Sequence, residues 1–175
     1  MRKRRLTAAA VAATLVASLA VAAVALGAPS SRQVEVLDDC DAASFNAVLG
    51  DGACVKDGGV TFEEFIGQLL AQGRAPAWRF APGHLKLAAG ETITARNRGG
   101  EFHTFTEVAA FGGGCVEELN ALLGLTPVPE CGIPGIFGTT GVAPGGTVST
   151  GPLAAGTHRF LCLIHPWMRT TATAG

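Results

Sequence analysis

Apolar and polar residues follow two different periods along this chain, and the period changes near residue 77. Between Thr61 and Gly73 the apolar positions are 62, 65, 66, 69 and 70, which is the spacing of one helix face. Thr61 is a suitable N-cap, Glu64 completes a capping box, and Gly73 ends the pattern. We therefore predict a helix at about 61–72. We interpret Glu63 and Glu64 as charges that stabilise its first turn.

From residue 77 onward the pattern alternates over short segments. Gly and Pro separate these segments, as at Pro82-Gly83 and Gly90. Such spacing predicts short strands in a β-sandwich or barrel. The predicted strands lie at 78–80, 85–87, 92–96, 102–108 and 157–163. Residues 44–49 and 116–123 predict short helical turns, and 127–146 is a loop rich in Gly and Pro. The expected fold class is therefore all-β with minor helices.

The first 28 residues have the pattern of a signal peptide. Four basic residues at 2–5 precede an uncharged run from 6 to 26, and Ala25 and Gly27 supply the small residues before a cleavage site. The alternative is an uncleaved membrane anchor, because about twenty apolar residues can span a bilayer. We expect a protein that is secreted, periplasmic or held at the outer face of the cell membrane.

The length of the chain indicates its domain size, and its net charge restricts the classes of partner. A chain of 175 residues is long enough for one domain with its own core. Cleavage would leave nine basic and fourteen acidic residues, a net charge of −5. A mildly acidic domain lacks the electrostatic footprint of a nucleic-acid-binding protein. We therefore expect no nucleic-acid partner, a membrane contact only if residues 1–28 stay attached, and a monomer.

The cysteine count is odd. Of the five cysteines, Cys40 with Cys54 and Cys115 with Cys131 are close enough to close loops of about 13 to 17 residues, each worth roughly 3 kcal/mol. Four cysteines allow three pairings, and we favour these two. Cys162 is then left over. A lone thiol in an oxidising compartment is reactive unless something such as a metal ion holds it.

The segment around Cys162 contains further metal-ligand types. Cys162, His165 and Met168 follow a Cys-x2-His-x2-Met spacing. Zinc sites rarely use Met, whereas one Cys, two His and a weak axial Met form the blue-copper arrangement. The second histidine is missing from this segment, and His103 is the best candidate for it. The sequence thus predicts copper, with His103, Cys162, His165 and Met168 as ligands.

The other two histidines have simpler interpretations. His84 follows Pro82-Gly83 and is expected on the surface. His158 alternates with Phe160 and Cys162, so it should share the face of the cysteine, and a structural role is favoured. Four histidines without a His-x-His pair argue against a multicopper oxidase.

With these ligands in place, residues 77–175 resemble a cupredoxin, with the short ligand-loop spacing of amicyanin. The resemblance implies a cupredoxin-like antiparallel Greek-key β-sandwich, one type 1 copper ion and electron transfer. It implies His103, Cys162 and His165 as ligands and Met168 as the axial ligand. The segments that carry it are Phe80-Ala-Pro82, residues 90–97, His103-Thr-Phe105, Pro144-Gly-Gly146, Ala155-Gly-Thr157 and the Cys162, His165, Met168 set.

The chain departs from the family pattern in three places. Thr104 stands where many members have Asn, and we expect it to orient the ligands instead. Residues 29–76 are an N-terminal extension without a counterpart, and about 111–142 is an insertion within the copper-binding domain of 77–175.

The expected function is that of a secreted electron carrier and not of an enzyme. We expect His165 to be a partly exposed ligand, and Ile164, Pro166 and Trp167 to form an apolar rim on which redox proteins dock. Two alternatives stay open. One is a copper storage or delivery protein, and the other is an extracellular binding module with a structural copper site.

Overall fold

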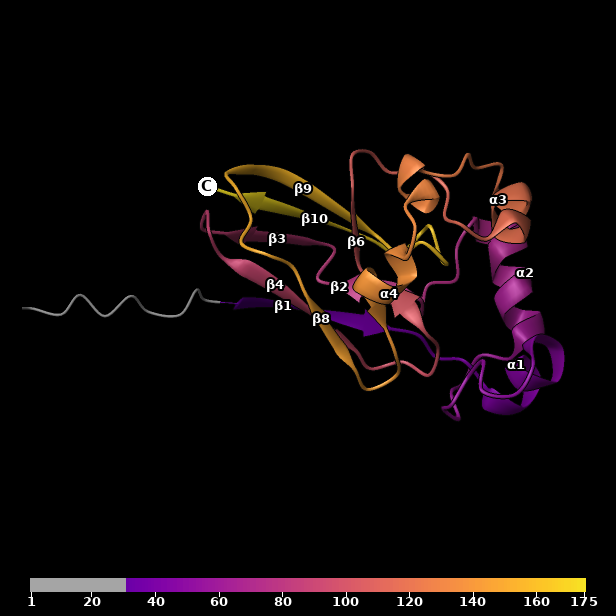
Figure 1. Cartoon of the computed structure of the whole chain (residues 1–175). Helices are drawn as coiled ribbons and strands as arrows, with labels where there is room; N and C mark the ends of the chain where they lie inside the picture. The colour runs from indigo at the N-terminus through magenta and orange to yellow at the C-terminus, as the bar shows by residue number, and fades with distance from the viewer. Residues whose placement is uncertain (1–30) are drawn as a thin grey trace, which may run out of the picture.

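The alternating segments form two facing sheets. The computed structural model describes residues 31–175, so the predicted signal peptide lies outside the described residues. Each of the two sheets contains four strands. The helices gather at one end of this sandwich (Figure 1). The predicted class, a mostly β fold with minor helices, is confirmed.

The strands predicted at 78–80, 85–87, 92–96 and 157–163 match strands of the structure closely, whereas those at 31–37, 147–149 and 169–174 were not predicted. From edge to edge, the first sheet consists of β2 (Arg79–Ala81), β1 (Ser31–Leu37), β4 (Thr92–Asn97) and β8 (Thr147–Ser149). In the same way, the second consists of β3 (His84–Leu87), β10 (Arg169–Ala174), β9 (Gly156–Leu161) and β6 (Thr106–Val108). A small separate ribbon pairs β5 (His103–Thr104) with β7 (Gly141–Val142). The single strand predicted at 102–108 is therefore split at Phe105, where the chain changes pairing partner.

The sheets are mixed, whereas the sequence predicted an antiparallel sandwich. In the first sheet β1 runs parallel to β4, and in the second β3 runs parallel to β10. Parallel neighbours need long crossover connections. The chain provides these connections, because two helices and two strands separate β1 from β4 in the sequence.

The strand β1 also changes the predicted domain boundary. Residues 29–76 were expected to lie outside the sandwich, but β1 pairs with both β2 and β4 in the first sheet. Its inward residues Val34 and Val36 are fully buried. These two apolar positions, set among polar ones, are sufficient for a strand with one buried face. The sandwich thus begins with β1, and the true extension follows it.

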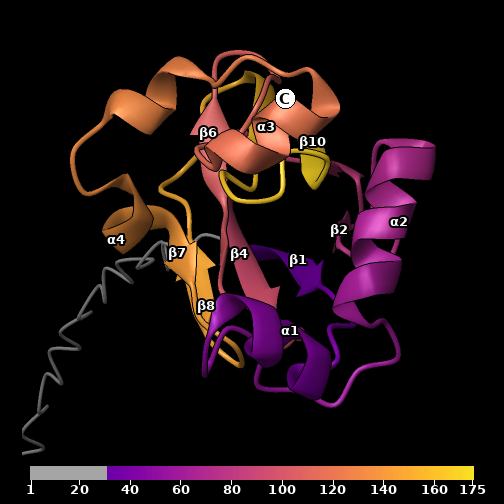
Figure 2. The ribbon, with the colours of Figure 1, turned by 90° about the vertical axis from the view of Figure 1, so that its right-hand side faces the viewer.

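That extension covers one end of the sandwich. It contains α1 (Ala42–Leu49) and α2 (Phe62–Gln72), and the insertion adds α3 (Glu117–Leu123), a 3-10 turn (Pro129–Gly132) and α4 (Ile136–Thr140). Figure 2 shows α1, α2 and α3 arranged around this end. The capping box predicted for α2 is present, with Thr61 and Glu64 bonded reciprocally. None of the helices between residues 31 and 175 has the length and hydrophobicity that a membrane span requires.

Both predicted disulfides are present. Cys40–Cys54 ties the end of β1 to the segment after α1, and Cys115–Cys131 ties the start of α3 to the 3-10 turn. Two disulfides fit an oxidising compartment. In the part of the chain that the structure describes, Cys162 is the free cysteine, and it is buried.

The side chain of Phe65 anchors α2 to the sandwich. Its ring lies 4.7 Å from that of Trp78, 5.8 Å from that of Trp167 and 6.3 Å from that of His165, measured between centroids. Such aromatic contacts add to the free energy of area burial. Phe65 therefore holds α2 over the loop that contains His165.

We predict that Phe65→Ala destabilises the protein by about 3–5 kcal/mol, because it leaves a cavity between α2 and the sandwich. Leu70→Ala is the matched control on the same helix, where the side chain is 67% exposed, and it should change the free energy of unfolding by less than about 0.5 kcal/mol. Denaturant unfolding measures both. Equal effects of the two substitutions would contradict the anchoring role.

Candidate metal centre

Three of the four predicted ligands converge on one buried point. The Sγ of Cys162 lies 3.7 Å from Nδ1 of His103 and 3.8 Å from Nδ1 of His165, and the two Nδ1 atoms are 3.2 Å apart. All three residues are buried. Ligand atoms at about 2.0–2.3 Å from a shared ion, with angles of about 105–120° at the ion, are separated by about 3.2–4.0 Å. The triangle therefore has the size of a metal site.

Two separate parts of the sandwich supply this triangle. His103 opens β5 and is held by pairing with Val142 of β7. Cys162 directly follows β9, and His165 lies in the loop before β10. Two backbone hydrogen bonds close that loop, from the Cys162 amide to the Met168 carbonyl (3.1 Å) and from the Met168 amide to the His165 carbonyl (2.9 Å). Met168 is fully buried, and its role as axial ligand stays a prediction.

Thr104 connects the two parts, as the sequence indicated. Its hydroxyl accepts a hydrogen bond from the Leu163 amide at 2.7 Å. Its own amide donates to Sγ of Cys162 at 3.5 Å. One residue thus fixes the loop through its side chain and stabilises negative charge on the sulfur through its backbone.

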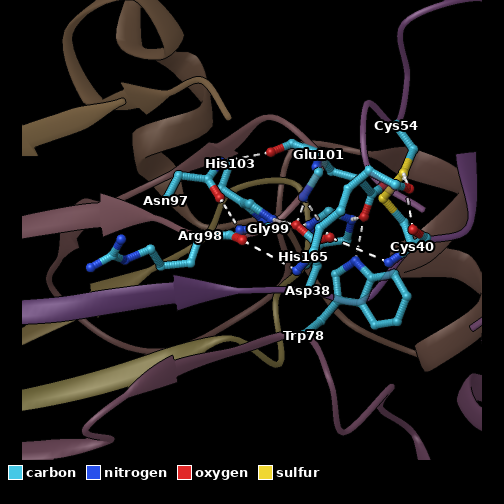
Figure 3. Close-up of polar contacts among 12 residues, drawn as sticks. Asp38, Cys40, Cys54, Trp78, Asn97, Arg98, Gly99, Glu101, His103 and His165 are labelled. Atoms are coloured by element: carbon cyan, nitrogen blue, oxygen red, sulfur yellow. Dashed lines mark hydrogen bonds and ion pairs between the residues drawn. A yellow bond between two sulfur atoms is a disulfide. The ribbon is translucent and has the colours of Figure 1, made fainter. Parts of the chain in front are cut away.

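A buried carboxylate that the sequence analysis missed holds His103 from behind. Oδ2 of Asp38 lies 2.8 Å from Nε2 of His103, and neither side chain is exposed. Asp38 also accepts hydrogen bonds from the amides of Gly100 and Glu101, at 2.8 and 3.2 Å. A Cβ at Gly99 would overlap this carboxylate, so the loop needs glycine there. Figure 3 shows Asp38 beside His103 and the 99–101 loop.

A second carboxylate stands behind His165. Oε2 of Glu101 lies 3.7 Å from Nε2 of His165 and accepts a hydrogen bond from the indole of Trp78. Each imidazole thus has a carboxylate on its Nε2 side and its Nδ1 at the centre (Figure 3). The Asp38 carboxylate is within hydrogen-bond distance of Nε2, so it keeps a proton there and leaves Nδ1 of His103 free to bind a metal.

The electrostatics of the centre favour a thiolate. Burial opposes ionisation of Cys162, but hydrogen bonds and charges from His103 and His165 outweigh it and hold the pKa of the thiol well below its usual range. Burial likewise opposes protonation of His103, but hydrogen bonds to Asp38 and Cys162 raise its pKa to about 9. The thiolate is the form of cysteine that binds metals.

The carboxyl groups have opposite pKa shifts. For Asp38, burial raises the pKa, but the hydrogen bonds with His103 and Gly100 outweigh it and the pKa is lowered. For Glu101, burial dominates over the attraction to His165 and raises the pKa. Of the two carboxyl groups, Asp38 is therefore the one that its surroundings favour as an anion.

The prediction that His165 is partly exposed is wrong. The residue is only 4% exposed. Phe65 of α2 approaches its ring edge-on, and the Trp167 ring packs against it at 5.4 Å between centroids. The cause is α2, whose position over the ligand loop no local sequence pattern could reveal.

The remaining histidines lie outside the cluster. His158 contacts Glu107 at 2.6 Å and the Ala154 carbonyl at 2.9 Å, so it has the structural role that was favoured. His84 is exposed on β3. Two signals for the missed residues were present in the sequence: Asp38 directly follows an alternating segment, and Glu101 lies two positions before His103.

No family model matches the sequence, and no curated protein is significantly similar to it. Solved structures do resemble it. A purple cupredoxin from Nitrosopumilus maritimus is 14% identical, with a TM-score of 0.43 over 82% of this chain and 99% of that chain. Plastocyanin from Dryopteris crassirhizoma is 14% identical, with a TM-score of 0.40 over the same shares.

Amicyanin from Paracoccus versutus is 14% identical, with a TM-score of 0.36 over 55% of this chain and 73% of that chain. These names agree with the cupredoxin resemblance of residues 77–175. At such low similarity they carry no conclusion about the site, whose assignment depends on the side chains of this chain.

We predict that Thr104→Val lowers the free energy of unfolding by about 1–3 kcal/mol, because it leaves the buried Leu163 amide without its acceptor. Thr104→Ser retains the hydroxyl and should cost clearly less. Denaturant unfolding of the metal-free protein measures both. If Thr104→Ser cost as much as Thr104→Val, the hydroxyl would contribute no more than the methyl group, and the hydrogen bond would not be the main contribution of Thr104 to stability.

Proposed function

We propose that this protein is a secreted type 1 copper protein that carries single electrons between redox partners and is not an enzyme. The observation that carries the proposal is the buried triangle of His103, Cys162 and His165. One thiolate and two imidazoles in one plane are the equatorial ligands of a blue-copper site. Bound there, copper would supply reversible one-electron chemistry.

The donor set supports copper over zinc. A structural zinc site closes with four Cys or His ligands, whereas the cluster among residues 31–175 offers three. The fourth predicted ligand, Met168, lies in the same closed loop and has a soft thioether. The two predicted disulfides use the other four cysteines, which leaves one thiolate for the metal.

The rigidity of the ligands supports electron transfer over copper delivery. His103 is held by Asp38 and by β-pairing, and Cys162 is held by the Thr104 amide. Ligands fixed in this way need little rearrangement when the charge of the ion changes. Burial of all three residues also opposes the rapid exchange that a delivery protein requires. We propose that redox partners dock on the apolar residues around His165 and Trp167.

The experiment that tests the function is an optical and EPR spectrum of the purified protein after addition of copper. We expect an intense visible band from the thiolate–copper bond and reversible reduction by voltammetry. Cys162→Ser should abolish the band, and His103→Ala should open or lose the site. Colourless protein after copper loading would overturn the proposal. Bound copper without the band would favour the structural-copper alternative.

A second prediction concerns the charge of Asp38. Asp38→Asn should raise the copper reduction potential, because an anion behind His103 favours the more positively charged cupric ion. A unit charge at such range is worth on the order of 1–2 kcal/mol at the effective dielectric of a protein, and 1.4 kcal/mol corresponds to about 59 mV for one electron.

Voltammetry of the copper protein measures this shift. Asp39→Asn is the matched control, since it removes the same charge from the neighbouring residue, for which the structure shows no contact with His103. It should shift the potential much less. Equal shifts in both variants would mean that only the net charge matters and not the contact with the imidazole.

A further inference from the structure

A cavity of about 540 Å³ lies among the three helices at the metal end of the sandwich, with His165 in its wall. We call it the helix cavity. Phe45 of α1, Phe62 and Phe65 of α2, and Leu119 of α3 contribute to its lining. Figure 2 shows these helices arranged around the end of the sandwich. The volume is within the range of small-molecule sites, about 300–1,000 Å³.

The wall of the helix cavity is mainly apolar, with three Phe rings beside five aliphatic side chains. The rings of Phe45 and Phe62 meet edge to face at 5.3 Å between centroids, and those of Phe45 and Phe65 at 5.5 Å. Aromatic rings prefer such edge and offset contacts with a further ring. At the mouth, Leu49 of α1 is exposed to solvent although it lines the cavity. The apolar lining, with its three Phe rings, therefore suits an apolar ring system.

The polar groups of the cavity indicate which polar group a bound molecule would carry. They are the carboxyl groups of Glu101 and Glu118 and the ring of His165. An ionised carboxylate only accepts hydrogen bonds, and Glu118 is exposed at the surface. No basic residue is among those that line the cavity. An anionic ligand is therefore disfavoured, and a hydroxyl that can donate is favoured.

We infer that the helix cavity binds an uncharged aromatic alcohol of the phenol class, which donates an electron through His165. The role as donor rests on the proposed function, whereas binding does not. With copper(II) bound, the phenol would lose one electron to it, giving copper(I), and the hydroxyl proton would pass to water at the cavity mouth. The phenol leaves as a neutral oxyl radical.

Burial of His165 makes this route specific. The ring is covered by Phe65 and Trp167, so a docked protein contacts the residues around the ring and not the ring itself. A molecule inside the helix cavity reaches the imidazole wall without any movement of α2. The short distance for electron transfer from the cavity to His165 compensates for the burial of this metal ligand.

The binding test uses 2-naphthol as the probe and 2-naphthoate as the matched ligand control, which has the same rings with a carboxylate in place of the hydroxyl. With copper(I)-loaded protein, we expect saturable binding of 2-naphthol at least about tenfold tighter than that of 2-naphthoate. Amide shift changes in a ¹⁵N NMR titration should centre on Phe45, Phe62 and Leu119. Equal affinities, or shifts on another face, would overturn the proposal.

Variants separate the cavity from the surface around it. Leu119→Trp fills the cavity and should weaken 2-naphthol binding at least about tenfold. Leu122→Trp is the control on the same helix, where the side chain is 40% exposed, and should leave binding unchanged. Equal losses in both variants would overturn the assignment. If Leu119→Trp fails to fold, the NMR titration of the unaltered protein still decides.

The kinetic test distinguishes this proposal from the proposed function. The rate at which 2-naphthol reduces the copper(II) protein should saturate at the concentration that saturates binding. Binding without saturable reduction would overturn the donor role. If the protein bound no copper, the proposed function would fail, while titration of the metal-free protein would still support or overturn the cavity as a phenol site.

Discussion

The contact between Asp38 and His103 is the constraint on which the metal end of this protein depends. A buried carboxylate is costly unless its oxygens are bonded, and this one accepts from an imidazole and from two amides of the 99–101 loop. It therefore joins three segments: the end of β1, the loop after β4 and the start of β5. Because β1 runs parallel to β4, both strands deliver their ends to the same edge of the sheet, and the carboxylate meets the ring there.

The N-terminal extension and the insertion both cover the metal end of the sandwich. The aromatic side chains of α1 and α2 pack around Trp78, which in turn donates to the carboxylate behind His165. The helices that cover this end are thus packed in unbroken contact with the metal centre. A cover of this kind removes solvent from the ligands, which strengthens every charge interaction among them. It also leaves the helix cavity as the approach to His165.

Local patterns in the sequence correctly predicted the features that depend on interactions between residues close together in the chain. The spacing around Cys162, the capping box at Thr61 and the short disulfide loops all involve residues close together in the chain. The strand β1 was missed because its two buried valines lie in a polar stretch. Asp38 was missed because its partner His103 is 65 residues away, and only the pairing of β1 with β4 brings them together. The prediction that His165 is partly exposed failed for the same reason, because α2, which covers His165, is remote from it in the sequence.

The charges of the centre explain why such a site can be buried at all. Before a metal is bound, Cys162 and Asp38 favour their anionic forms, and a proton on His103 offsets part of that charge. A divalent cation that replaces this proton meets the Cys162 thiolate and the Asp38 carboxylate, whose two charges balance its own, while burial opposes ionisation of Glu101 and raises its pKa. Neutral clusters avoid most of the cost of placing charge in a protein interior. A site without Asp38 would retain a net positive charge with the same ion. The distant carboxylate thus makes a buried, covered metal centre compatible with a stable fold.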